Sequence, residues 1–195
     1  MVEALTTTLR RLAPLLAFLA FPTAVFAHRL DEYLQATLVA IEPGVVRLQI
    51  NLTPGVEVAE KVLARIDRDN NNAISKNESA AYAELLKRDL TLRLDGQKLK
   101  LKLTASKFPA LTELRRGLGI IQIEFSATLD SLAPGPHKLV LENRHLPALS
   151  VYLINAAQPK TRTIQITSQK RTDNQGAGEI EFTFHPSERP DPASL

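Results

Sequence analysis

The stretch IQIEFSATL, residues 121–129, decides the class of fold. Apolar side chains alternate in it with polar ones: Ile121, Ile123, Phe125, Ala127 and Leu129 against Gln122, Glu124, Ser126 and Thr128. Successive side chains of a β-strand point to opposite faces of its sheet. This period of two therefore predicts a strand with one face buried in a core and the other in solvent.

The same alternation recurs along much of the chain. It is clear at residues 46–52 and 99–103, and further strands are predicted at 34–41, 138–141, 150–154, 163–167 and 179–184. Turn residues separate several of these segments: Pro43-Gly44, Asp95-Gly96 and Pro134-Gly135-Pro136. An Asp-Gly pair between alternating segments is a strong hairpin signal. The pattern predicts an α+β chain that is mainly an antiparallel β-sandwich or open barrel.

The period becomes helical between residues 54 and 90. Val58, Val62 and Ile66 recur every four residues, and the Thr53-Pro54 pair before them fits an N-cap followed by a first-turn proline. A second apolar stripe follows the polar segment 67–78 and comprises Tyr82, Leu85, Leu86 and Leu90. The sequence thus predicts an inserted helix–loop–helix at 54–90 and a shorter helix around 111–118. We expect one β-rich domain at 28–185 and a disordered tail at 186–195, PSERPDPASL being its sequence from Pro186.

The polar segment DRDNNNAISKNE, residues 67–78, has the length and spacing of an EF-hand calcium loop. Calcium takes six to eight oxygen ligands, which such a loop supplies from positions 1, 3, 5, 7, 9 and 12. Ile74, at position 8, is expected to anchor the middle of the loop to the core. Magnesium prefers a smaller octahedral shell with several waters, so calcium is the predicted ion. The predicted ligands are Asp67, Asp69, Asn71, Ala73 through its carbonyl, Ser75 and Glu78.

Two features of this loop predict weak binding. The sixth position, usually glycine, is Asn72, and asparagine is the residue that best replaces glycine in a left-handed conformation. Asn71 in place of an aspartate leaves three carboxylates to neutralise the ion. We expect an affinity typical of extracellular modules, roughly 10⁻⁴ to 10⁻³ M. Because Ser75-x-x-Glu78 also forms a helix capping box, an ion-free capped loop is the alternative.

The N-terminal end predicts export. Arg10 and Arg11 precede an apolar run at 12–21, and the small residues Ala24 and Ala27 follow it, which is the pattern of a secretory signal peptide. The run is short for a bilayer, which needs roughly 20 apolar residues. We expect cleavage of residues 1–27, with an uncleaved anchor as the alternative. No later segment of the sequence is apolar for long enough to span a membrane.

Composition narrows the chemistry further. The chain has no cysteine, which excludes disulfides, thiolate zinc sites and thiol catalysis and fits a bacterial periplasm. The net charge is +3 with charges interspersed, so we expect no nucleic-acid partner. No Ser-His-Asp pattern, Gly-rich phosphate loop or H-E-x-x-H motif is present, and we predict a protein that is not an enzyme. The row of Lys98, Lys100 and Lys102 is more typical of a solvated sheet edge than of an anion site.

Cleavage after Ala27 would make His28 the N-terminal residue. A terminal amine and an imidazole on one residue can chelate copper or nickel, so a periplasmic transition-metal handling protein is the alternative function. The histidines that could complete such a site are His137, His145 and His185. The segment 143–145, Asn-Arg-His, is either a recognition loop or a capped turn, and we favour the turn.

Three stretches carry a resemblance to known proteins: HRLDEYLQATL at 28–38, the loop running into ESAAYAELL at 78–86, and DLTLRLDGQKL at 89–99. They resemble bacterial exported EF-hand domain proteins, and they are similar to the extracytoplasmic N-terminal domain of nickel/cobalt transporter-like proteins. The resemblance implies a periplasmic β-rich domain with one calcium loop and the ligand roles given above. It also implies a protein partner, with a membrane transporter as one candidate. We therefore expect an exported, non-catalytic calcium-binding module.

Overall fold

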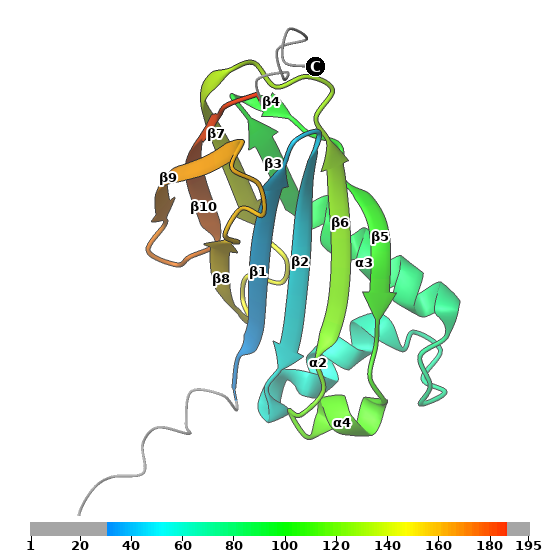
Figure 1. Cartoon of the computed structure of the whole chain (residues 1–195). Helices are drawn as coiled ribbons and strands as arrows, with labels where there is room; N and C mark the ends of the chain where they lie inside the picture. Colours follow the sequence, from blue (N-terminus) through cyan, green and yellow to red (C-terminus); the bar gives the residue numbers. More distant parts are fainter. Residues whose placement is uncertain (1–30, 187–195) are drawn as a thin grey trace, which may run out of the picture.

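The computed structural model describes residues 31–186 of the chain, and Figure 1 shows how their elements are arranged. The signal peptide predicted at 1–27 and residues 187–195 of the predicted tail lie outside the described residues. The strands are β1 (Tyr33–Glu42), β2 (Val45–Pro54), β3 (Leu90–Leu94), β4 (Gln97–Lys98), β5 (Lys102–Lys107), β6 (Ile121–Thr128), β7 (Gly135–Asn143), β8 (Ser150–Ala156), β9 (Ile164–Arg171) and β10 (Ala177–Phe184), and the helices are α2 (Val56–Ile66), α3 (Lys76–Asp89) and α4 (Leu111–Arg115).

The strands form two sheets of five. The first has the order β5-β6-β2-β1-β8, and the second has the order β4-β3-β7-β10-β9. Every pair is antiparallel except β1 and β8, which are parallel. In Figure 1 the second sheet lies behind the first, with α3 beside β5. The predicted α+β class with mostly antiparallel sheets is confirmed.

The alternation that predicts strands also selects the core. In β6 the apolar positions of the 121–129 stretch are buried, and the polar positions between them face outward. Burying one large apolar side chain contributes about 1.5–3 kcal/mol, so a one-residue slip of such a strand would be costly. Both sheets and helices α2 and α3 contribute to a single apolar cluster, for example through Leu48, Leu141, Val62 and Leu86.

The start of α2 differs from the prediction. Thr53 and Pro54 belong to β2, and Gly55 is the N-cap of the helix. The reason is that β2 stays paired with β1 as far as Pro54, whose partner is Tyr33. The Gly55 amide then donates to the carbonyl of Glu32 at 2.8 Å, which ties the helix start to the beginning of β1.

The predicted strand at 99–103 is wrong in its bounds. Residues 99–101 lie between β4 and β5, where the chain passes from the edge of one sheet to the edge of the other. Leu101 is buried there, while Lys98, Lys100 and Lys102 are exposed, as expected for a solvated edge. The hairpin predicted at Asp95-Gly96 joins β3 to β4, and both residues have the positive φ that a type I′ turn requires.

The short helix is also shorter than predicted. It ends at Arg115 because Gly117 turns left-handed, with a φ of 67°, and the Leu118 amide returns to the Glu113 carbonyl at 3.0 Å. The other predicted strands are present, with bounds that shift by a few residues. Among the described residues, no helix combines the length and apolar character needed to cross a membrane.

Candidate functional site

The loop between α2 and α3 gathers three carboxylates. Asp67 is the C-cap of α2, and Ser75 is the N-cap of α3, so the loop leaves one helix and enters the next directly. Asp67, Asp69 and Glu78 each offer a carboxylate oxygen, and these oxygens lie within 4.8 Å of one another. Like charges at this separation repel, so the cluster is a candidate site for a cation.

Two of the carboxylates also organise the backbone of the loop. The Asp67 carboxylate accepts hydrogen bonds from the amides of Asn71 and Asn72, at 3.1 and 3.0 Å. The Glu78 carboxylate accepts from the amides of Arg68 and Ser75, at 2.8 and 2.9 Å. Glu78 thus fastens the first residues of the loop to the start of α3, and the loop is folded around the acidic cluster.

Hydrogen bonds stabilise the charged form of Glu78. The Ser75 hydroxyl donates to it at 2.7 Å and, together with the amides of Ser75 and Arg68, lowers the pKa of the Glu78 carboxyl to about 2. The Glu78 amide in turn donates to the Ser75 hydroxyl, which completes the capping box that the sequence offers as the alternative to a calcium loop. Capping holds the carboxylate at the loop, but both its oxygens accept hydrogen bonds, so bidentate ligation would require a donor such as the Ser75 hydroxyl to turn away.

The remaining loop positions follow the sequence prediction in part. Asn72 is left-handed, with a φ of 62°, as expected for the residue that replaces glycine, and Asn70 has a φ of 56°. Ile74 packs against the core as predicted. The Asn71 side chain accepts from the Ala73 amide and donates to Asp69, so its oxygen is engaged in a local turn. The three carboxylates among the six predicted ligands thus lie together, with the Ser75 hydroxyl 2.7 Å from Glu78 and the Asn71 amide group 2.9 Å from Asp69.

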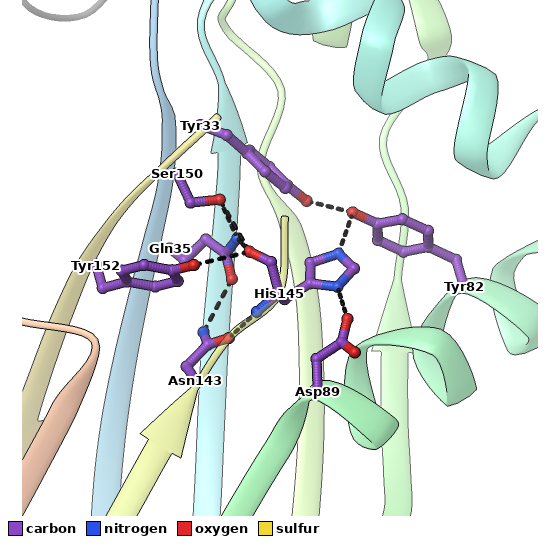
Figure 2. Close-up of polar contacts among 8 residues, drawn as sticks. All are labelled: Tyr33, Gln35, Tyr82, Asp89, Asn143, His145, Ser150 and Tyr152. Carbon is purple, nitrogen blue, oxygen red and sulfur yellow. Dashed lines mark hydrogen bonds and ion pairs between the residues drawn. The ribbon is translucent and has the colours of Figure 1, made fainter. Parts of the chain in front are cut away.

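A second polar cluster, which the sequence analysis missed, is buried between β1, α3 and the segment that follows β7. Figure 2 shows its members gathered around one residue, His145, some at its imidazole ring and others at its backbone. We call it the His145 hub; its residues are Tyr33, Gln35, Tyr82, Asp89, Asn143, His145, Ser150 and Tyr152.

Both ring nitrogens of His145 are bonded, although its side chain is 0% exposed. Nδ1 lies 2.7 Å from an Asp89 carboxylate oxygen, and Nε2 lies 3.0 Å from the Tyr82 hydroxyl. The Tyr82 hydroxyl lies 2.7 Å from that of Tyr33. A carboxylate only accepts, so Nδ1 carries the hydrogen and Nε2 accepts from Tyr82. Tyr33 then donates to Tyr82, and every group is satisfied with a neutral ring.

The environment favours that neutral form. Burial lowers the pKa of His145, and its effect outweighs the hydrogen bond and charge of Asp89, which raise it; the charge of Arg65 adds to the lowering. Burial likewise raises the pKa of both Tyr33 and Tyr82, so these hydroxyls keep their hydrogens.

The other half of the hub fixes the backbone around His145. Gln35 donates to the His145 carbonyl at 2.8 Å and accepts from Asn143 at 2.9 Å. The Asn143 side chain accepts from the His145 amide at 2.9 Å, which is the capped turn favoured from the sequence. Tyr152 and Ser150 also donate to the His145 carbonyl, both at 3.0 Å. The predicted capped turn is present, but its side chains point inward and connect β7 to β1 and β8.

The hub has the groups of an acid–base site without access for a substrate. His145 and Gln35 are both fully buried, so no molecule from solvent reaches the ring in this structure. The signal that could have revealed the hub is the polar residues Tyr33, Gln35 and Thr37, which occupy alternate positions of β1 and are all buried.

Of the three histidines predicted to complete a copper site, His185 is exposed, whereas His137 and His145 are hydrogen-bonded through both ring nitrogens. His137 binds Asp95 through Nδ1 and the Ala133 carbonyl through Nε2, both at 2.7 Å. Burial opposes protonation of His137, but these bonds outweigh it and raise its pKa. His145 is engaged in the hub, so either ring would have to give up a hydrogen bond to ligate copper. His28 lies outside the described residues.

Comparisons with models of protein families, with curated proteins and with solved structures find no match for this chain. The resemblance to exported EF-hand domain proteins therefore stays a prediction that rests on the quoted residues. The geometry of the two sites is the remaining basis for a function.

Proposed function

We propose that this protein is an exported, non-catalytic calcium-binding module, in which an EF-hand-like helix–loop–helix stabilises a β-sandwich. The observation that carries the proposal is the convergence of Asp67, Asp69 and Glu78 within 4.8 Å, at positions 1, 3 and 12 of a loop with calcium-loop spacing. The capping box accounts for Ser75 and Glu78, and hydrogen bonds to loop amides engage Asp67 and Asp69, but neither role requires three carboxylates within 4.8 Å of one another.

Calcium suits these ligands better than magnesium does. The cluster supplies oxygen from carboxylates on a twelve-residue loop, and calcium accepts the flexible geometry that such a loop provides. Binding restricted to the folded chain stabilises it by RT ln(1 + [Ca²⁺]/Kd). With 10 mM calcium and an affinity of roughly 10⁻⁴ to 10⁻³ M, this amounts to about 1.4–2.7 kcal/mol. The ion would hold α2 and α3 together and stiffen the surface that meets a partner protein, a membrane transporter being one candidate.

The experiment is a thermal melt of the purified chain, followed by circular dichroism because the chain has no tryptophan. Calcium at millimolar concentration is compared with chelator and with magnesium. We expect calcium alone to raise the Tm, and Glu78→Gln to abolish the rise. Glu84→Gln is the matched control, because Glu84 lies on the same helix and pairs with Lys87 away from the loop. An equal shift in the Glu78 variant would overturn the ligand assignment.

A further inference from the structure

One helix connects the acidic loop to the His145 hub. Glu78 lies in the first turn of α3, Tyr82 follows four residues later on the same face, and Asp89 is the last residue of the helix. Both Tyr82 and Asp89 hydrogen-bond the ring of His145, one on each nitrogen. A single imidazole therefore anchors α3 at its middle and at its end, while Glu78 organises the loop at its start.

The hydrogen-bond chain is satisfied only while this imidazole is neutral. A protonated ring would present an N–H to the Tyr82 oxygen, so Tyr82 would have to turn its own hydrogen toward Tyr33. Within residues 31–186 the Tyr33 hydroxyl bonds Tyr82 alone, and both hydroxyls are buried. One hydroxyl hydrogen is then left without an acceptor, whichever way the two groups rotate. Burying an unsatisfied donor is costly, so charging His145 strains the anchor.

We propose that the His145 hub is a proton-operated anchor: mild acid charges His145, breaks the Tyr33–Tyr82–His145 chain and loosens helix α3 together with the loop that it carries. Release would weaken calcium binding, and by linkage calcium would oppose protonation of the ring. The calcium half of this inference rests on the proposed function, and the release of α3 does not.

The charged and titratable groups around the ring set the direction. From α3, the Asp89 carboxylate favours a charged ring, and Tyr82 accepts or donates as the ring requires. From α2, the positive charge of Arg65 disfavours it. Tyr33 of β1 and Tyr152 of β8 are neutral hydroxyls that face the ring and its carbonyl. Burial and the charge of Arg65 lower the pKa of His145 by more than Asp89 raises it. Helix α3 is therefore expected to be released at a pH below the ordinary histidine pKa of about 6.5.

The first test follows the stability of the full chain between pH 7.5 and 5, without calcium. We expect the wild-type Tm to fall with acid and His145→Gln, which keeps a neutral acceptor, to remove most of this fall. His137→Gln is the control, because the raised pKa of His137 gives it the opposite pH dependence. Amide exchange of the unmodified chain is measured in parallel, so the result does not depend on a variant that folds. Acid should lower the protection factors, which are exchange rates corrected for the intrinsic pH dependence, in α3 (Lys76–Asp89) before it lowers them in β6. A uniform loss of protection, or an unchanged acid response in His145→Gln, overturns the anchor.

The second test measures calcium affinity by calorimetry at pH 7.5 and 5.5. His145→Gln keeps every loop ligand, so the pH dependence of its calcium affinity reports only the protonation of the loop carboxylates. Couplings between sites commonly change affinities by about 5- to 150-fold, and we expect the wild-type ratio between the two pH values to exceed that of the variant by at least about fivefold. Equal ratios overturn the coupling and leave the calcium function standing. If neither the wild type nor the variant binds calcium, the proposed function is refuted. The first test then decides by itself whether the hub anchors α3.

Discussion

Tyr82→Phe removes the middle group of the hydrogen-bond chain and probes its energetics directly. The change leaves the Nε2 of His145 without a donor and the Tyr33 hydroxyl without an acceptor, and both groups are fully buried. A buried polar group left unsatisfied costs about 1–3 kcal/mol, so the two together predict a loss of about 2–6 kcal/mol. That is a large part of the total stability of a domain, which is about 5–15 kcal/mol.

The same chain of hydrogen bonds predicts that the effect of Tyr33→Phe on the free energy of unfolding changes sign when Tyr82 is also replaced. In the wild-type background Tyr33→Phe removes one hydrogen bond but orphans no donor, so it should cost about 0.5–1.5 kcal/mol. In the Tyr82→Phe background it removes the orphaned hydroxyl and should restore about 1–3 kcal/mol. Urea denaturation followed by circular dichroism at pH 7.5 gives the four free energies of unfolding. A Tyr33→Phe cost that is equal in the two backgrounds would refute the directional chain, because independent sites are additive.

Three further predictions test other parts of the structure. Gly178→Ala places a methyl 2.8 Å from the Cγ2 of Ile154, where β10 meets β8, and should lower the free energy of unfolding by about 1–3 kcal/mol in urea; an unchanged free energy would contradict the close approach. Asn72→Ala should destabilise the chain by about 1–2 kcal/mol in a thermal melt, because a φ near 62° is unfavourable for alanine. Asn72→Gly should leave the Tm nearly unchanged in the same experiment. His137, whose pKa is raised by Asp95, contributes stability that is complete below pH about 6.5 and is lost as the pH rises through its folded-state pKa; a His137→Gln chain that differs from wild type equally at pH 5 and pH 9 would contradict this.

The features that the sequence predicted are those with a local cause. The strand at 121–129, the turn at Asp95-Gly96, the capping box of Ser75 and the left-handed Asn72 each follow from a few adjacent residues. The same holds for the grouping of the loop carboxylates, whose spacing along twelve residues brings them together without help from the rest of the fold.

The features that the sequence did not predict depend on residues far apart. His145 meets Tyr82 and Asp89 across separations of 63 and 56 residues, and Asn143 meets Gln35 across 108. Apart from the alternate polar positions of β1, no local pattern marks these residues, because their partners are set by strand pairing between β1, β8 and β7. The early start predicted for α2 failed for the same reason, since only the partner strand β1 extends β2 as far as Pro54.

Strand β1 shows how the hub contributes to the register of the sheet. Its outward positions include Leu34 and Leu38, which are 38% and 41% exposed, while Tyr33, Gln35 and Thr37 face inward. On hydrophobicity alone, the first half of this strand would favour the opposite face. A one-residue slip would bury these leucines, but it would also turn Tyr33 and Gln35 to solvent and leave His145 and its carbonyl without their buried partners. The hydrogen bonds of the hub therefore favour the observed register in the first half of β1, and the burial of Val39 and Ile41 on the same face favours it in the second half.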